Sequence, residues 1–319
     1  MRLRIVAAAS LLALPVLPAN GQSPLNVVAT IGMIGDIAQT VGGDCIALET
    51  MMGPGIDPHL YRATARDVQT LNRADLILYS GHGLEGELGR VFERYAERVS
   101  TLAVAEAAID RGDLIATDTA YGVDPHVWMD VSLWARTVPV IAQELTALVP
   151  QCADPIAASA QAYQAQIDAL HQWVGTSIAS IPPDQRILVT AHDAFAYYGR
   201  AYGIDVAGIQ GISTQSEAAI ADIRDTAELI TDRGVPAIFV ESTINPRTIQ
   251  AVLEAVRQSG QQIEIGGQLY SDAMGDAGTY GGTYLGMIYS NTVAITSALG
   301  GTPAPLPPAL ADWQTRWSL

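Results

Sequence analysis

The amino-acid sequence predicts an α/β protein of two doubly wound lobes joined by one long rigid helix. Segments with the patterns of strands and helices alternate in both halves of the chain, which is typical of parallel sheets covered by helices. Between the halves lies a long Ala- and Gln-rich stretch of helical periodicity, without a Gly/Ser linker. The length of 319 residues also exceeds the usual size of one domain, and 49% hydrophobic residues suffice for two packed cores.

The first residues are typical of a secretory signal peptide. Arg2 and Arg4 precede the apolar run 5–17, and the small residues Ala19 and Gly21 fit a cleavage point after Gly21. No cysteine lies near this point, so we expect an exported, periplasmic protein that is not a lipoprotein. The chain is therefore expected to contain a signal peptide at 1–21, an N-terminal α/β lobe at 22–152, a linking helix at 153–182 and a C-terminal α/β lobe at 183–319.

The N-terminal lobe begins with a strand, a helix that two glycines stop, and a second strand that a Gly-Pro-Gly sequence ends. Thr64 is expected to cap the next helix, and the near-continuous apolar run that follows predicts a strand buried on both faces. Strands are expected at 27–30, 45–52 and 74–80, and helices at 33–41, 64–72 and 85–98.

The linking helix is predicted from apolar residues that recur at helical spacing, such as Ile167, Leu170 and Val174. The C-terminal lobe then repeats the alternation of strands and helices. Its strands are expected at 186–190, 204–210, 236–241 and 262–267, and its helices from about 194 and at 217–232, 246–259 and 282–299. The Pro-rich tail at 302–313 is expected to lie on the surface.

Charge and composition exclude several classes of function. The formal net charge is −16 and no basic cluster is present, which argues against a nucleic-acid partner. All 17 basic residues are Arg. The lack of Lys excludes a Schiff-base lysine and a Walker-type phosphate loop. An acidic protein of this kind suits the capture of cations.

The tripeptide Asp-Pro-His occurs twice in a chain that has only five histidines, and it ends at His59 and at His126. Each proline stiffens the approach to the histidine. Asp57 and Asp124 are each expected either to cap a turn or to hold the second imidazole nitrogen, as metal-ligating histidines require. A single copy would be read as a turn with a solvated histidine. Two copies favour a pair of metal ligands.

Two further ligands are expected from the other half of the chain. His192 comes directly after a buried strand, and Asp272 follows the strand at 262–267 more closely than Asp276 does. Because the carboxyl ends of parallel strands form the ligand edge of an open sheet, these side chains are expected to meet the first two histidines in the cleft between the lobes. Three imidazoles and one carboxylate suit a divalent d-block ion. Glu241, at the end of another strand, is expected to support a ligating histidine.

The remaining histidines and the two cysteines have structural interpretations. His82 follows a strand, and His171 lies on the linking helix, where we expect it to be solvated. Cys45 and Cys152 are expected to form a disulfide in an oxidising compartment, and the alternative is two separate buried thiols.

At these residues the chain resembles the metal-binding solute-binding proteins of ABC transporters, the TroA-like zinc/manganese group. The resemblance covers essentially the whole mature chain, with its motifs in the family's order. The motifs are MGPGIDPHLY, ADLILYSGHGLE, DPHVWMD, TAHDAFAYYGRAYG, FVEST and LYSDAMGDAGTYGGTYLGM.

The resemblance implies one Zn²⁺ or Mn²⁺ bound between two lobes by His59, His126, His192 and Asp272, and delivered to an ABC-transporter permease in the membrane. We expect a monomer. The stretch 105–123 lacks the histidine-rich loop that zinc-dedicated members often carry, which leaves the choice of metal open. An alternative is a zinc hydrolase or hydratase that uses the three histidines and a metal-bound water. A role as a surface adhesin can coexist with metal binding.

Overall fold

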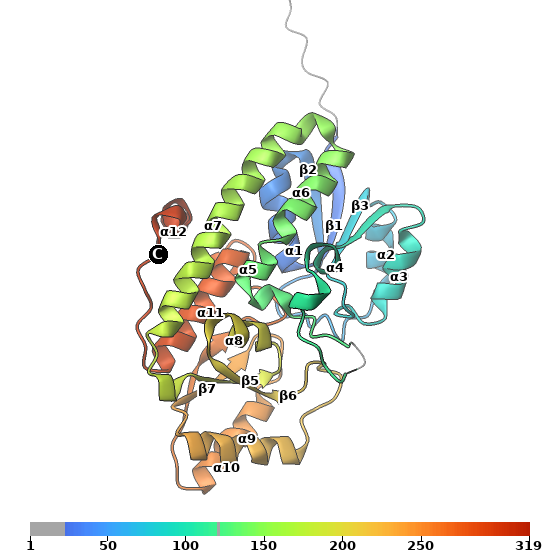
Figure 1. Cartoon of the computed structure of the whole chain (residues 1–319). Helices are drawn as coiled ribbons and strands as arrows, with labels where there is room; N and C mark the ends of the chain where they lie inside the picture. Colours follow the sequence, from blue (N-terminus) through green and yellow to red (C-terminus); the bar gives the residue numbers. More distant parts are fainter. Residues whose placement is uncertain (1–22, 120–121) are drawn as a thin grey trace, which may run out of the picture.

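A computed structural model describes residues 23–119 and 122–319 of the chain as two α/β lobes stacked along one long helix (Figure 1). The predicted signal peptide and its cleavage point lie outside these residues. The long helix α7 (Ala153–Ala179) passes both lobes, as the helical spacing predicts. Of the helices in the described part of the chain, none is both long and apolar enough to span a membrane.

The N-terminal lobe contains a parallel four-stranded sheet in the order β2-β1-β3-β4. Side chains of successive strand residues point to opposite faces, so Val27 and Val28 enter two different hydrophobic clusters. Helices cover both faces, which confirms the doubly wound prediction for this lobe. The strands are β1 (Leu25–Ile31), β2 (Ile46–Met52), β3 (Leu76–Tyr79) and β4 (Ser100–Ala103), and the helices α1 (Gly32–Gly42), α2 (Ala65–Leu71), α3 (Leu88–Tyr95), α4 (Val104–Ala108), α5 (Val131–Trp134) and α6 (Thr137–Leu148).

Local signals position several of these elements. Thr64 caps α2 as predicted, because its hydroxyl accepts a hydrogen bond from the main-chain N–H of Asp67 while the Asp67 carboxylate accepts one from the N–H of Thr64. The helix predicted at 85–98 is shorter, since only Leu88–Tyr95 is helical. The short strand β4 and the helix α4 that follows it were not predicted from the sequence.

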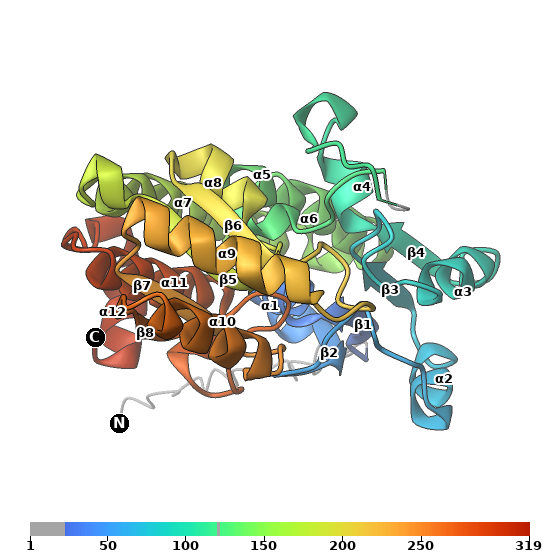
Figure 2. The ribbon, with the colours of Figure 1, turned by 90° about the horizontal axis from the view of Figure 1, so that it is seen from below.

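The C-terminal lobe also has only parallel strands, but hydrogen bonds join them as two pairs, β5 with β6 and β7 with β8. Strand β5 lies next to β7, so the two pairs are neighbours. Helices α9 and α10 lie side by side over one face (Figure 2), and α7, α8 and α11 cover the other. The elements are β5 (Ile187–His192), α8 (Ala196–Tyr202), β6 (Asp205–Gln210), α9 (Ile220–Arg233), β7 (Ala237–Glu241), α10 (Arg247–Gln258), β8 (Glu264–Leu269) and α11 (Tyr284–Ala298).

One hydrophobic core continues from the first lobe into the second. Its buried members include Ile34 on α1, Leu170 on α7, Tyr198 on α8 and Ile288 on α11. The helix α7 packs against α1 and α6 of the N-terminal lobe and against α8 and α11 of the C-terminal lobe. The lobes therefore share packed side chains as well as the chain that connects them.

Most of the Pro-rich tail lies on the surface as predicted, but two of its residues are buried. The tail ends in a helix, α12 (Ala311–Trp317), and Leu310 and Trp313 belong to the shared core. The Trp313 ring packs against Tyr289 of α11, with ring centres 5.6 Å apart. The indole N–H of Trp173 on α7 also donates a hydrogen bond to the carbonyl of Ala304, at 2.7 Å. Apolar burial and this hydrogen bond therefore hold the tail against the body.

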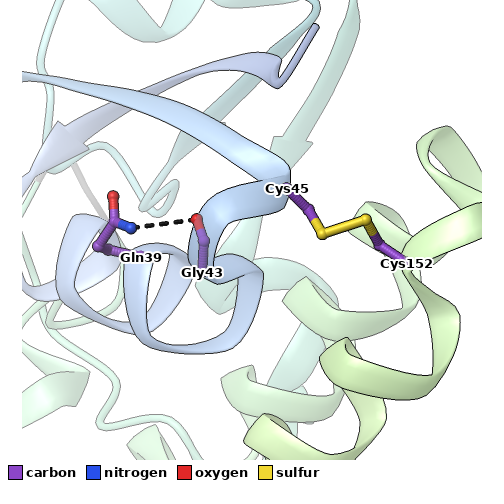
Figure 3. The surroundings of a disulfide bond; sticks show 4 residues. All are labelled: Gln39, Gly43, Cys45 and Cys152. Atoms are coloured by element: carbon purple, nitrogen blue, oxygen red, sulfur yellow. Dashed lines mark hydrogen bonds between the residues drawn. A yellow bond between two sulfur atoms is a disulfide. The ribbon is translucent and has the colours of Figure 1, made fainter. Parts of the chain in front are cut away.

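A disulfide joins Cys45 and Cys152, which confirms the predicted pairing and excludes two separate thiols (Figure 3). Cys45 directly precedes β2, and Cys152 directly precedes α7. Gly43 has a positive φ of 51° just before this point, and its carbonyl accepts a hydrogen bond from the Gln39 side chain at 3.3 Å. The disulfide therefore links the start of β2 to the start of α7, at the edge of the sheet where strands begin.

Candidate metal centre

The four predicted ligands meet at the opposite edge, where the strands end. His59 lies in the loop after β2, and His126 immediately precedes a short 3₁₀ turn that leads into α5. His192 is the last residue of β5 itself, whereas the sequence pattern places it just after the strand. Asp272 comes soon after the end of β8. Two ligands come from each lobe.

The side chains of His59, His126, His192 and Asp272 form a compact donor set. Each offers one ligand atom, and these atoms all lie within 4.8 Å of one another. The Nε2 atoms of His59 and His126 are 3.2 Å apart. Nε2 of His126 is 3.4 Å from Oδ1 of Asp272, and Nε2 of His192 is 3.2 Å from Oδ2 of the same carboxylate. Imidazole nitrogens and a carboxylate oxygen at this spacing could hold one metal ion.

Burial makes this set costly without a cation. The relative exposed areas are 4% for His59, 0% for His126 and His192 and 1% for Asp272. Within the part of the chain that the structure describes, three atoms of the set lack a hydrogen-bond partner of good geometry: both carboxylate oxygens of Asp272 and Nε2 of His192. The distance between His192 and Asp272 is nevertheless short enough for an ion pair. Buried polar atoms of this kind are usually satisfied, so the residues fit a bound cation.

Three carboxylates outside the donor set position the three histidines through hydrogen bonds. The main-chain N–H of His59 donates to Asp57 Oδ1 at 2.8 Å, and that of His126 donates to Asp124 Oδ1 at 2.9 Å. Asp124 Oδ1 also accepts from the Nδ1 of the His126 imidazole, at 2.7 Å. Because a carboxylate accepts at Nδ1, the Nε2 of His126 faces the other ligands. Glu241, at the end of β7, holds His192 in the same way.

The electrostatics of the metal-free site differ between the histidines. Burial lowers the pKa of His59 to about 4, although the nearby Asp272 carboxylate opposes this shift. Burial also disfavours charge on His126, but Asp124 and then Asp272 outweigh it and raise its pKa to about 9. Glu241 and Asp272 likewise raise the pKa of His192 well above its usual value against the effect of burial.

Asp272 titrates in the opposite sense. Burial alone would raise the pKa of this carboxyl group, but the positive charges on His192 and His126 lower it well below its usual value. These pKa shifts favour protonated imidazoles at His126 and His192 and an ionised Asp272 when no ion is bound. A bound cation replaces those protons as the partner of the carboxylate.

The two histidines outside the set have other surroundings. His82 is half-buried with a positive φ of 53°, and its main-chain N–H donates to Glu106 Oε1 at 2.7 Å. The expectation that His171 is solvated is wrong, because this side chain is half-buried and its Nδ1 lies 3.1 Å from the hydroxyl of Tyr202 on α8.

The loop 211–216 of the C-terminal lobe also contacts the site, although no sequence motif predicted it. The hydroxyl of Thr214 donates to Asp57 Oδ2 at 2.6 Å, and the side-chain amide of Gln215 donates to the carbonyl of His59 at 3.4 Å. The loop follows β6 at the carboxyl edge of the sheet. That position is the one signal in the sequence that could have identified it.

Comparisons with known proteins agree with this fold. The family described as ZnuA, zinc-uptake complex component A, periplasmic, matches residues 27–298. The manganese-binding lipoprotein MntA of Bacillus subtilis (strain 168) is 43% identical over 280 residues, which cover 88% of this chain and 91% of MntA. The zinc-binding protein TroA of Treponema pallidum (strain Nichols) is 45% identical over 273 residues, 86% of this chain and 88% of TroA.

The solved structure of the periplasmic zinc-binding protein TroA from Treponema pallidum superposes with a TM-score of 0.84. It is 45% identical and covers 86% of this chain and 99% of its own. The manganese ABC transporter substrate-binding lipoprotein PsaA of Streptococcus mitis is 30% identical over 287 residues, 88% of this chain and 91% of PsaA. These relatives are named binding proteins, so the zinc-hydrolase alternative is not supported. The chain belongs to the ZnuA family of metal-binding, substrate-binding proteins of ABC transporters.

Proposed function

We propose that His59, His126, His192 and Asp272 together bind one divalent transition-metal ion, which the protein captures and passes to the permease of an ABC transporter. The observation that carries this proposal is the buried meeting of four donor atoms from two lobes within 4.8 Å. The four donor side chains are buried, so an ion held by them is largely removed from solvent. That arrangement suits transport of the ion, because no coordination position is directed at a reactant.

The donor set favours zinc over manganese. Imidazole ligands suit Zn²⁺, and Mn²⁺ lies at the weak end of the divalent affinity order and prefers oxygen ligands. Asp272 supplies the one carboxylate of the set, so oxygen donors are in the minority. The relatives TroA and MntA are named zinc-binding and manganese-binding proteins and have similar identity to this chain, so the preference for zinc is inferred from the ligands alone.

The proposed place of action is the periplasm. The signal-like N-terminus and the disulfide both favour an oxidising compartment outside the cytoplasm. The relatives MntA and PsaA are named lipoproteins. In this chain the only two cysteines are joined to each other, so we propose that neither carries a lipid. We further propose a monomer, with lobe boundaries at 152/153 and 182/183 on either side of the helix α7.

Metal titration of the purified protein tests the ligand assignment. Wild-type protein is expected to bind one zinc ion per chain, and His126→Ala and Asp272→Ala are each expected to lose most of the affinity. His171→Ala is the matched control, because this half-buried histidine lies outside the donor set, and it should bind zinc as the wild type does. Unchanged stoichiometry and affinity in His126→Ala would contradict the proposal.

A further inference from the structure

The three supporting carboxylates differ in where their second hydrogen bond goes. Asp124 and Glu241 each accept the main-chain N–H of one histidine and also the imidazole N–H of that same histidine. Both partners then belong to one lobe. Asp57 accepts the main-chain N–H of His59 with Oδ1, but its Oδ2 accepts the hydroxyl of Thr214 in the opposite lobe. The support of His59 therefore depends on contact between the lobes.

Thr214 is itself held firmly by its own lobe. Its side chain is buried, with 7% of its area exposed. The side-chain amide of Gln210, the last residue of β6, donates to the carbonyls of Thr214 at 3.1 Å and of Ser216 at 2.6 Å. These bonds fix the loop 211–216 to the end of a strand. A continuous path of hydrogen bonds thus runs from β6 through Thr214 and Asp57 to the main chain of His59.

The other side of the cleft is packed as a hydrophobic core. Trp128, two residues after His126, is fully buried, and its indole N–H donates to the carbonyl of Ser271 at 2.9 Å. The buried hydroxyl of Tyr284 donates to the carbonyl of Trp128 at 2.8 Å, and that of Tyr197 donates to the carbonyl of Asp124 at 2.8 Å. Separating the lobes here would expose large aromatic side chains to water.

The His59 side lacks such packing. Ile56 and Leu60, on either side of the Asp-Pro-His sequence, have 40% and 52% of their area exposed. An open cavity of about 1090 Å³ borders His59 on this side and reaches Gln215 in the other lobe. The contacts here between the two loops are polar, and water can replace polar contacts far more readily than buried aromatic ones.

We infer that the hydrogen bond between Thr214 and Asp57 is a clasp that retains the metal ion, and that the ion enters and leaves on the His59 side when this clasp opens. The inference rests on the proposed function of the site. Thr214 is a positioning residue that touches no donor atom of the set. It acts by holding Asp57, which holds the main chain of His59. The ligands His126 and His192 stay in place while the clasp opens.

Release kinetics of zinc test the clasp. Zinc-loaded protein is mixed with an excess of chelator, and the dissociation rate constant is compared among wild type, Thr214→Val and Thr214→Ser. The valine removes the hydroxyl at similar volume and is expected to raise the rate about tenfold, the equivalent of about 1.4 kcal/mol. The serine keeps the hydroxyl and is expected to release zinc like the wild type. A valine variant with the wild-type rate, or a serine variant as fast as the valine, would overturn the clasp.

Hydrogen exchange on the wild-type protein gives a second readout that needs no variant. Zinc is expected to slow exchange strongly in the segment 55–62, and much less in 124–131, which the aromatic core already protects. An equal change in both segments would overturn the inference. Wild-type protein that binds no zinc would instead refute the proposed function, so the two failures are distinguishable.

Discussion

Glu241 and His192 are joined by two hydrogen bonds across neighbouring strands. Oε1 of Glu241 accepts the main-chain N–H of His192 at 2.8 Å, and Oε2 lies 2.5 Å from Nδ1 of its imidazole. Both side chains are completely buried. The carboxylate therefore keeps the proton on Nδ1 and directs Nε2 at Asp272, as a metal ligand requires.

Replacing this carboxylate is expected to weaken metal binding although Glu241 touches no ion. Glu241→Gln keeps the size of the side chain but removes the charge that makes the imidazole a stronger donor. We expect zinc affinity to fall roughly 10- to 100-fold, as is usual for such outer contacts. Competition titration against a chelator of known affinity measures this. The control Glu264→Gln, at an exposed position on β8, should match the wild type, and equal affinities for both variants would contradict the expectation.

Zinc affinity is expected to rise with pH over a pH range that lies above the usual pKa of histidine. In the metal-free protein Asp124 and Asp272 overcome burial and hold the pKa of His126 at about 9, so below that pH the ring carries a proton that the ion must displace. Each displaced proton raises the apparent affinity about tenfold per pH unit up to that pKa. The pKa of His192 is also raised, so a second proton adds to this slope.

Calorimetry in buffers of different ionisation enthalpy measures the protons released on zinc binding. The count is expected to be between one and two at neutral pH, and to decline as the pH approaches 9. A zinc affinity that does not change with pH across this range would show that the imidazoles are already neutral in the metal-free protein.

Removal of the disulfide is expected to lower stability without changing metal affinity. The bond joins residues 107 positions apart, so on the chain-entropy model its loss lowers the free energy of unfolding by about 2–5 kcal/mol. The sulfurs lie where β2 and α7 begin, whereas the donor set lies where strands end. Urea unfolding of Cys45→Ser/Cys152→Ser, beside a zinc titration of the same variant, checks both halves of the expectation. A large loss of zinc affinity would show that the two edges are coupled.

The donor set is expected to prefer zinc to manganese by at least about tenfold, or 1.4 kcal/mol. The physical reason is that three of its four side chains are imidazoles. His192→Glu exchanges one imidazole for a carboxylate and is expected to narrow the gap. Competition titration of the metal-free protein with both ions measures it. Manganese binding as tight as zinc binding in the wild type would show that the geometry imposed by the lobes, rather than ligand type, sets selectivity.

Much of this fold could be predicted because its signals are local. Apolar runs such as the one at 74–80 mark buried strands, and Thr64 marks the start of a helix. The repeated Asp-Pro-His indicates His59 and His126 because each histidine carries its supporting carboxylate two residues earlier. The pairing of Cys45 with Cys152 needs only the cysteine count and the compartment.

The features that the sequence analysis missed depend on contacts between distant segments. Thr214 and Asp57 are 157 positions apart, and no local sequence pattern around either residue predicts their hydrogen bond. Trp313 lies in a Pro-rich segment that is expected on the surface, but its ring packs on Tyr289 and is buried. His171 looks solvated on its own helix, but Tyr202 of α8 lies against it. In each case tertiary contact, which local pattern does not encode, decides the outcome.

The continuous core beneath the two lobes limits how the protein can unload its cargo. Side chains such as Leu170 and Tyr198 belong to one buried core, so a separation of the lobes along α7 would expose them to water at a cost in free energy. We therefore expect opening at the rim beside His59, where the contacts between the lobes are polar. A membrane partner would therefore not have to pull the molecule open. It would need only to compete for a few hydrogen bonds at that rim. The packed core shared by the two lobes would then return the protein to its closed shape for another cycle.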